Sequence, residues 1–463
     1  MSGTFEDITV PPTLVSFAVT TGKTQQVISP EFKGVGHRVM FIRPQYGEKG
    51  LPLPESQKQV YETVTRLMRQ GHVLSAYTPT YGGIAEAVMK MCFGNGIGFE
   101  FEKSVSNQVL FEYNYGAFIL ELADDAEMPP LGVLLGRTAD KPVITKNNET
   151  LSLSDLLNVY EDKLESVYPC NIEQGKNEIS AVSYEAVSYP RVRVRPSKPR
   201  VLIPVFPGTN CEYDTAKAMS RAGADAEIFV INNLSPAGVS QSVEAFAAEL
   251  KQSQIVFVPG GFSGGDEPDG SGKFITAFFR NAAVSEQINE LLSNRDGLMC
   301  GICNGFQALI KLGLVPFGRI IDTDESCPTL TFNTIGRHQS RLVRTRIASN
   351  KSPWLMNTKP GQIYTVPISH GEGRFIADEK TLEQLIANGQ IATQYVDLDG
   401  NPTGDIRFNP NNSIFAVEGI TSPDGRVFGK MGHSERIDRD LYKNVDGVFD
   451  MKMFESAVKY FEI

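Results

Sequence analysis

The chain has 463 residues, enough for two or three domains, and its 41% hydrophobic and 21% charged residues are typical of a globular protein. The formal net charge of -10 argues against a general binder of nucleic acid or of anionic membranes, because both surfaces would repel the chain. No apolar run approaches the roughly 18 residues of a membrane span, and the sparse cysteines follow no secretion signal, so we expect a cytoplasmic protein without a disulfide framework.

The first 190 residues predict an α+β arrangement. Residues 56–71 carry apolar side chains at helical spacing and end in glycine, which predicts a helix. A strand at 73–77 and a helix at 84–96 follow, and the alternating segments 108–113 and 116–122 predict a hairpin. We divide this part into residues 1–50 and 51–190, followed by a linker of prolines and arginines at 191–199.

From residue 200 to 463 the pattern changes to strands that alternate with helices. Buried-type strands are predicted at 201–206, 227–232, 255–258 and 297–302. This alternation is typical of parallel βαβ units in a doubly wound, flavodoxin-like α/β sheet. In such sheets the chemistry gathers at the carboxyl ends of the strands.

Cys303 lies at such an end, within the sequence Gly-Ile-Cys-Asn-Gly at 301–305. Glycine two positions to either side lets the chain turn sharply and present the thiol, as in a nucleophile elbow. The N-terminus of the next helix favours a thiolate, and the amide of Asn304 can bind an oxyanion. The alternatives are a buried structural cysteine, or a C-x-x-C redox or zinc pair with Cys300. A second cysteine pair for zinc is missing, so we expect no metal site.

His433 and Glu435 supply the base and acid that a cysteine nucleophile needs. They follow a predicted hairpin, and residues two apart on a strand project from the same face. His370 shares the H-x-E spacing but sits among glycines, which favours a supporting role beside the site. His338 is interpreted as structural.

Residues 259–266, Pro-Gly-Gly-Phe-Ser-Gly-Gly-Asp, follow the strand at 255–258. Glycines there let backbone amides face an oxyanion, which points to Gly260 and Gly261. A phosphate-binding loop is the rival interpretation, but Glu267 and Phe274 occupy positions where that motif requires Gly and Ser or Thr. Cys211 lies in the turn after the strand predicted at 201–206. It lacks the flanking glycines of a nucleophile elbow and is interpreted as a turn residue.

Five motifs, PGTNCE, PGGFSGGD, GICNGFQ, HGEGRF and GHSER, resemble in order and spacing the C-terminal part of phosphoribosylformylglycinamidine synthase, a ligase of purine biosynthesis. The resemblance covers residues 200–463 and implies that Cys303, His433 and Glu435 form the catalytic triad of a glutamine amidotransferase. The oxyanion-binding and substrate-binding residues that it implies are Gly260, Gly261, Phe262, Asn304, Gln307, Asn333 and His370.

Residues 1–190 are similar to the second half of the synthase portion, an aminoimidazole ribonucleotide synthetase-like α+β domain. The stretch TPTYGGIAEAVMKMCFGNGIGFEF carries this resemblance, although Thr80 and Tyr81 stand where the family has Ser-Asp. Residues 1–3 resemble the end of a loop that is interior to the family's chain, so we expect the first synthase half to be missing. Residues 1–50 would then be a remnant of the synthetase-like N-terminal subdomain.

The expected function is glutamine hydrolysis that supplies ammonia for the ATP-dependent conversion of formylglycinamide ribonucleotide to formylglycinamidine ribonucleotide. The resemblance implies ATP and Mg²⁺ as cofactors of the complete enzyme, bound with the ribonucleotide through the missing half, and no cofactor for glutamine hydrolysis itself. No nucleic acid or membrane partner is expected. Two alternatives stay open: a truncated chain that acts only as a glutaminase or is inactive, and a separate cysteine hydrolase on a related fold.

Overall fold

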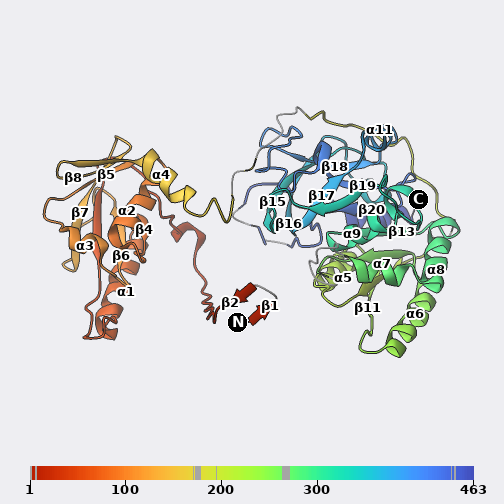
Figure 1. Ribbon diagram of the computed structural model, residues 1–463, viewed down its shortest axis with the longest axis horizontal. Helices are drawn as coiled ribbons and strands as arrows, with labels where there is room; N and C mark the ends of the chain where they lie inside the picture. The colour runs from red at the N-terminus through yellow and green to blue at the C-terminus, as the bar shows by residue number, and fades with distance from the viewer. Residues whose placement is uncertain are drawn as a thin grey trace. The chain divides into compact units, whose positions relative to one another are not determined.

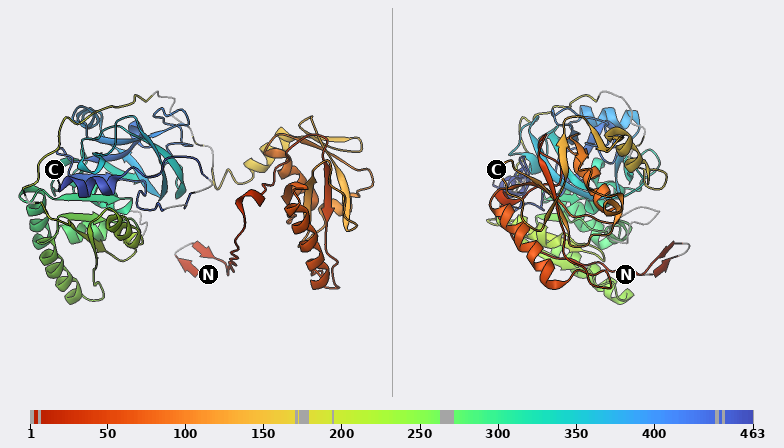
Figure 2. Two further views of the ribbon diagram at one scale, coloured as in Figure 1. Left: turned by 180° about the vertical axis from the view of Figure 1, so that it is seen from behind. Right: turned by 90° about the vertical axis from the view of Figure 1, so that its left-hand side faces the viewer.

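The structure, a computed structural model, describes residues 3–5, 8–169, 172, 179–193, 195–262, 272–438, 441–442 and 445–462. The chain divides into two compact units, Met1–Pro169 and Cys170–Ile463, each of which is described by itself (Figures 1 and 2). Among the described residues, no helix combines the length and the apolar character needed to cross a bilayer.

The first unit is built on one sheet. Its strands are β1 (Gly3–Phe5), β2 (Ile8–Val10), β3 (Arg38–Ile42), β4 (Val73–Tyr77), β5 (Gly98–Phe101), β6 (Phe118–Leu122), β7 (Gly132–Ala139), β8 (Val143–Lys146) and β9 (Glu149–Ser152). Its helices are η1 (Thr24–Gln26), α1 (Pro54–Arg69), α2 (Gly83–Phe93), α3 (Asn107–Phe111) and α4 (Leu153–Asp162). Strands β3 to β9 form a sheet in the order β4-β6-β3-β7-β5-β8-β9, and β1 and β2 pair separately.

The helices at 56–71 and 84–96 and the strand at 73–77 are confirmed as α1, α2 and β4, but the hairpin predicted at 108–122 is wrong in its first half. Residues 107–111 form α3 instead of a strand. The Ser106 hydroxyl accepts a hydrogen bond from the Val109 amide at 3.3 Å, which caps the helix. A short apolar alternation does not outweigh a good helix cap.

The boundaries of the units differ from the expected division of the sequence. Strand β3 lies between β6 and β7, so residues 38–42 share one sheet with the strands after residue 51. Residues 179–193 pack on the second unit, where the amide of Val182 donates to Gln394 at 3.0 Å and that of Tyr184 to Ala348 at 2.9 Å. Val182 and Val192 belong to that unit's hydrophobic core.

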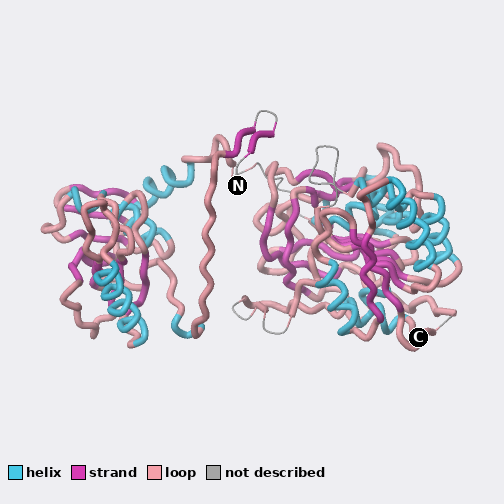
Figure 3. Tube along the Cα trace, turned by 90° about the horizontal axis from the view of Figure 1, so that it is seen from below, coloured by secondary structure: helices cyan, strands magenta, loops and turns pink. Residues whose placement is uncertain are grey.

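The second unit is a mixed sheet covered by helices, which lie along its outside in Figure 3. Its strands are β10 (Arg200–Val205), β11 (Asp225–Val230), β12 (Ile255–Val258), β13 (Leu298–Ile302), β14 (Thr329–Phe332), β15 (Gln339–Ile347), β16 (Ile363–His370), β17 (Glu372–Ile376), β18 (Ile391–Val396), β19 (Val417–Thr421) and β20 (Val427–Lys430). Its helices are α5 (Glu212–Arg221), α6 (Pro236–Leu250), α7 (Lys273–Phe279), α8 (Ala282–Ser293), α9 (Asn304–Lys311), η2 (Pro353–Leu355), η3 (Ile414–Ala416), α10 (Leu314–Phe317), α11 (Glu379–Ala387) and α12 (Met453–Tyr460).

The main sheet has the order β11-β10-β12-β13-β20-β19-β18-β15-β16. The strands from β11 to β20 are parallel, as predicted for βαβ units, and those from β19 to β16 are antiparallel. In the register, Val258 pairs with Gly301, and Ile302 pairs with Lys430. The carboxyl ends of β12, β13 and β20 therefore meet at one edge of the sheet, and the chain segments that follow them converge there.

Candidate active site

Cys303 occupies a strained turn between β13 and α9. Its φ of 53° and ψ of -106° are unusual for a residue other than glycine. A side chain at Gly301 would collide with the Gly305 carbonyl, and one at Gly305 would collide with the Val258 carbonyl. Both glycines of the predicted elbow are therefore required by close packing. The thiol is buried, and its Sγ lies 3.6 Å from the Ser369 carbonyl oxygen.

The structure brings His433 and Glu435 together, with Nδ1 of the imidazole 2.6 Å from Oε1 of the carboxylate. The geometric reason given from the sequence was wrong, because β20 ends at Lys430 and the two residues lie in the turn that follows. Burial opposes a charge on the imidazole, but the Glu435 carboxylate and contact with the thiols of Cys303 and Cys211 outweigh it. The pKa of His433 is therefore raised well above its usual range.

Cys211, interpreted from the sequence as a turn residue, lies against the base. Its Sγ is 3.8 Å from Nδ1 of His433 and 3.0 Å from Oδ1 of Asn210. Burial raises the pKa of this thiol, which favours its protonated form and disfavours a second nucleophile. One group of side chains among the described residues could hold a metal ion. It consists of Cys211, His433 and Glu435, whose sulfur, nitrogen and oxygen atoms lie within 4.8 Å of one another.

Gly260 leaves room for the imidazole. A Cβ atom at this position would lie 2.6 Å from Cε1 of His433 and 3.3 Å from Sγ of Cys211. Both distances are too short for a relaxed contact. The absence of a side chain at Gly260 thus allows the loop after β12 to pack directly on the base.

Gly261 has a φ of 150° and forms an antiparallel bridge with Thr209. The flanking bonds run from the Phe262 amide to the Gly208 carbonyl at 2.8 Å and from the Asn210 amide to the Gly260 carbonyl at 3.2 Å. This is the non-hydrogen-bonded type of pair, in which the amide of Gly261 points away from Thr209. The amide of Phe262 is already engaged. The remainder of this motif, residues 263–266, lies outside the described residues, as does Glu267.

Asn304 and Gln307 link α9 to β17. Nδ2 of Asn304 donates to Oε1 of Gln307 at 2.9 Å, and Nε2 of Gln307 donates to the Glu372 carbonyl at 2.6 Å. Both side chains are buried. Their amide groups therefore fix the framework around the thiol.

Asn333 holds the turn after β16. Its Nδ2 donates to the carbonyls of His370 and Arg337 at 2.9 and 3.0 Å, and its Oδ1 accepts the Gly373 amide at 3.3 Å. The amide side chain is therefore engaged with the backbone on both of its polar ends.

His370, at the end of β16, is buried with a relative exposure of 2%, yet neither ring nitrogen has a hydrogen-bond partner among the described residues. Burial, and then the charges of His433 and His338, lower its pKa to about 3. The ring is thus neutral at physiological pH and presents one unused donor and one unused acceptor. Buried polar groups of this kind are rare and require an explanation.

Comparisons with known proteins show the family of the second unit. The CobB/CobQ-like glutamine amidotransferase domain family matches residues 198–461. Phosphoribosylformylglycinamidine synthase subunit PurQ of Methanococcus maripaludis is 34% identical over 281 residues, which are 57% of this chain and 97% of that protein. The chain belongs to the PurQ-like glutamine amidotransferases of phosphoribosylformylglycinamidine synthase. The resemblance that the five motifs indicated is thereby confirmed.

Two further similarities accompany this family match. PurQ of Treponema denticola is 37% identical over 251 residues, covering 51% of this chain and 88% of its own length. The solved structure of PurLQS from Thermotoga maritima covers 57% of this chain and 99% of the matched chain, at 24% identity and a TM-score of 0.41.

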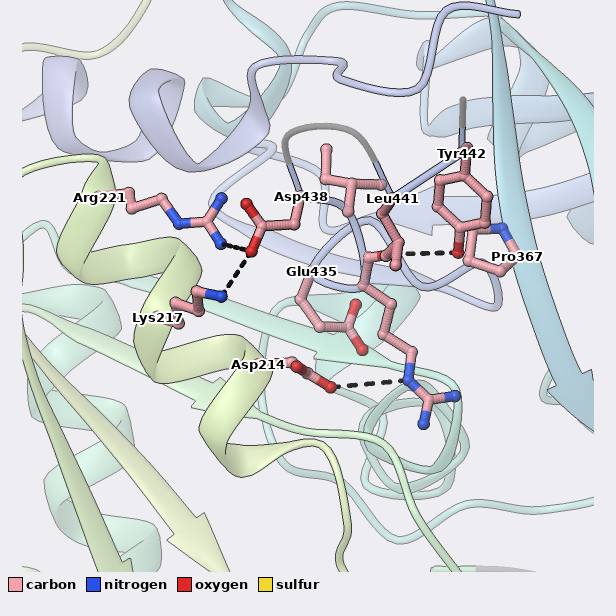
Figure 4. A pocket seen from close by; sticks show the side chains of 10 residues that line it. Asp214, Lys217, Arg221, Pro367, Glu435, Asp438, Leu441 and Tyr442 are labelled. Atoms are coloured by element: carbon pink, nitrogen blue, oxygen red, sulfur yellow. Dashed lines mark hydrogen bonds and ion pairs between the residues drawn. The ribbon is translucent and has the colours of Figure 1, made fainter. Parts of the chain in front are cut away.

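In this PurQ-like amidotransferase, Glu435 also lines a pocket of about 330 Å³ between α5 and residues 435–438, 441 and 442 (Figure 4). Asp438 of the same loop is 2.5 Å from Nζ of Lys217 and 3.1 Å from Arg221, both on α5. Oε2 of Glu435 is buried and has no partner among the described residues. The sequence did not indicate a role for Lys217, Arg221 or Asp438, because no motif marks them.

Proposed function

We propose that the second unit hydrolyses glutamine through a γ-glutamyl thioester on Cys303 and supplies the ammonia for formylglycinamidine ribonucleotide synthesis in the purine pathway. The observation that carries the proposal is the 2.6 Å pair of His433 and Glu435 beside a buried cysteine held in a strained elbow. Membership of the PurQ-like family supports the choice of glutamine as the substrate.

In the first step the Cys303 thiolate attacks the side-chain amide carbon of glutamine. The oxyanion is stabilised by the backbone amide of Asn304, at the start of α9, and by that of Gly261. His433, held as an imidazolium by Glu435, donates a proton to the departing nitrogen, the C–N bond breaks and ammonia leaves. A thioester remains on Cys303.

In the second step His433, now neutral, removes a proton from water while the water oxygen attacks the thioester carbon. The C–S bond breaks, glutamate leaves and the thiolate and imidazolium are restored. Glu435 orients the imidazole in both steps and stabilises its charged form.

We assign His370 to the glutamine pocket as a direct polar contact, because its two ring nitrogens are buried and find no partner in the part of the chain that the structure describes. Phe262 is 37% exposed and offers an apolar wall beside the loop. Gln307 and Asn333 act instead through the backbone groups that they hold.

The ligase context is part of the same proposal. The first unit is proposed as a synthetase-like domain on the resemblance of residues 78–101, and the complete enzyme would use ATP, Mg²⁺ and formylglycinamide ribonucleotide. The described turn before α2 does not fit a nucleotide phosphate, because Oε2 of Glu86 already accepts the Gly82 amide at 2.8 Å and the Thr80 hydroxyl at 3.0 Å. No step of glutamine hydrolysis depends on these cofactors. PurL and PurS subunits, with which a related PurQ is named in the complex PurLQS, are the proposed partners.

Glutamate release from glutamine by the purified chain, compared with a Cys303→Ala variant, tests the proposal. We expect turnover that disappears in the variant. Turnover that survives the substitution would refute the assignment of the nucleophile. If glutamine is not hydrolysed but a panel of esters or peptides is, the chain is a separate cysteine hydrolase. If neither class is turned over even with the partner subunits present, the chain is an inactive fragment.

A further inference from the structure

A fully buried ion pair lies directly beside the turn that carries His433. Lys430 at the end of β20 and Glu418 in β19 are both completely buried, and Nζ lies 3.2 Å from Oε1. Removing two charges from water costs so much free energy that a pair of apolar side chains in the same space often gives an equally stable fold. The stability of the fold alone therefore does not explain charges at these positions.

The two side chains hold the backbone on both sides of His433. Nζ of Lys430 donates to the Gly432 carbonyl at 2.7 Å and to the Ser434 hydroxyl at 3.1 Å, and Oε1 of Glu418 accepts the Gly432 amide at 2.6 Å. Together with the carboxylate, these acceptors use all three ammonium hydrogens. The turn is thus fixed at the residue before His433 and at the residue after it.

Lys430 also holds the nucleophile through its backbone. The amide of Cys303 donates to the Lys430 carbonyl at 2.9 Å, and Ile302 pairs with Lys430 across the sheet. One residue therefore contacts the backbone of the nucleophile with its carbonyl and the turn of the base with its side chain. A shift of the ammonium group would move His433 relative to Cys303.

The other end of the pair is equally well fixed. Oε2 of Glu418 accepts a hydrogen bond from the Thr393 hydroxyl on β18. A Cβ atom at Gly432 would lie 2.9 Å from Oε1 of Glu418 and 2.7 Å from Cγ1 of Val366, so the turn packs closely on the carboxylate. The network leaves little freedom for the turn, because charged hydrogen bonds in a buried site are strong and directional.

We propose that Lys430 and Glu418 are positioning residues, which fix the turn of His433 so that its imidazole faces the Cys303 thiol. The inference deepens the proposed function and rests on its thiol–imidazole relay. It concerns the geometry of that relay and not the identity of the substrate.

The test replaces both charges at once, in the double variant Glu418→Leu, Lys430→Met, which leaves no buried charge unpaired. The readout is the rate of alkylation of Cys303 by iodoacetamide as a function of pH, located by peptide mass mapping. We expect the alkylation profile to move to higher pH, because a displaced imidazolium stabilises the thiolate less. We expect kcat for glutamine to fall ~10-fold or more with KM unchanged, since misplacing a base affects the chemical step.

Val427→Ala serves as the matched control. Val427 lies on the same strand with its side chain in the core, so this variant lowers stability without touching the turn, and its alkylation profile is expected to match the wild type. If the double variant does not fold, Ser434→Ala decides, because it removes one hydrogen bond of Lys430 and leaves the charges paired. A smaller shift in the same direction supports the proposal.

The positioning role would be overturned if the alkylation profiles of the wild type and the double variant coincide. When the double variant does not fold, coincident profiles of the wild type and Ser434→Ala would overturn it. A wild-type chain that does not hydrolyse glutamine even with its partner subunits present would refute the proposed substrate. The comparison of alkylation profiles would still decide the positioning role, since iodoacetamide needs no glutamine site.

Discussion

We expect His370 to make the second unit sensitive to acid. Its pKa is lowered from 6.5 to about 3 by burial and by the charges of His433 and His338. Between these two values the unfolded chain binds a proton that the folded chain excludes, so stability falls as the pH falls from 6.5 towards 3. At pH 5 the resulting loss is about 2 kcal/mol relative to neutral pH, from the linkage between protonation and folding.

The variant His370→Leu removes this proton site and two buried ring nitrogens. Between pH 7 and pH 5, we expect the free energy of unfolding of the wild type to fall by about 2 kcal/mol more than that of the variant. Denaturant titrations at the two pH values measure this difference. The chain's single tryptophan, Trp354, is fully buried in the second unit, so its fluorescence follows the unfolding of that unit. His72→Asn, in the first unit, is the control and should leave the Trp354 transition unchanged.

Equal losses of stability in the wild type and in His370→Leu would refute this reasoning. That result would mean that the ring is protonated in the folded chain, or that water reaches its nitrogens. In either case the ring would not present an unused donor and acceptor to glutamine, and its assignment to the glutamine pocket would lose its main support.

Three further variants test the site. Gly260→Ala should lower kcat for glutamine by ~100-fold with an intact fold, because the new methyl group would lie 2.6 Å from the imidazole. A kcat near the wild-type value would show that the loop moves to relieve this contact. Glu435→Gln should lower kcat by ~100-fold or more and move the alkaline limb of kcat/KM to lower pH, because the carboxylate raises the pKa of His433; an unmoved limb in steady-state kinetics would contradict this. Cys211→Ala should keep kcat within about 3-fold of the wild type, since Cys211 is not the nucleophile, and a loss as complete as that of Cys303→Ala would argue that it is.

The parts of the site that the sequence predicts are those encoded over a few residues. The elbow at Cys303 follows from two glycines whose side-chain positions are filled by backbone atoms. The pairing of His433 with Glu435 depends only on their closeness in the chain, and it survives although the residues lie in a turn. The parallel strands are also predicted from short stretches of sequence, because buried apolar runs alternate with helical segments.

The remaining features depend on contacts between distant segments. Cys211 contacts His433 because β10 and β20 belong to one sheet and the segments after their carboxyl ends lie on the same side of it. Nothing near Cys211 in the sequence indicates this contact. Asn333 was expected to contact the substrate, but its amide holds the turn after β16. The pair of Lys430 and Glu418 was missed because charged residues in strands are normally assigned to the solvent face. The helix at 107–111 was missed because a cap outweighs a short alternation.

The most direct test of the central claim is rapid acid quenching of the chain with glutamine, in the presence of its partner subunits, followed by peptide mass mapping. A γ-glutamyl thioester should be found on Cys303 and should be absent from Cys303→Ala. An adduct on Cys211, or continued glutamate release with no adduct on either cysteine, would contradict the account.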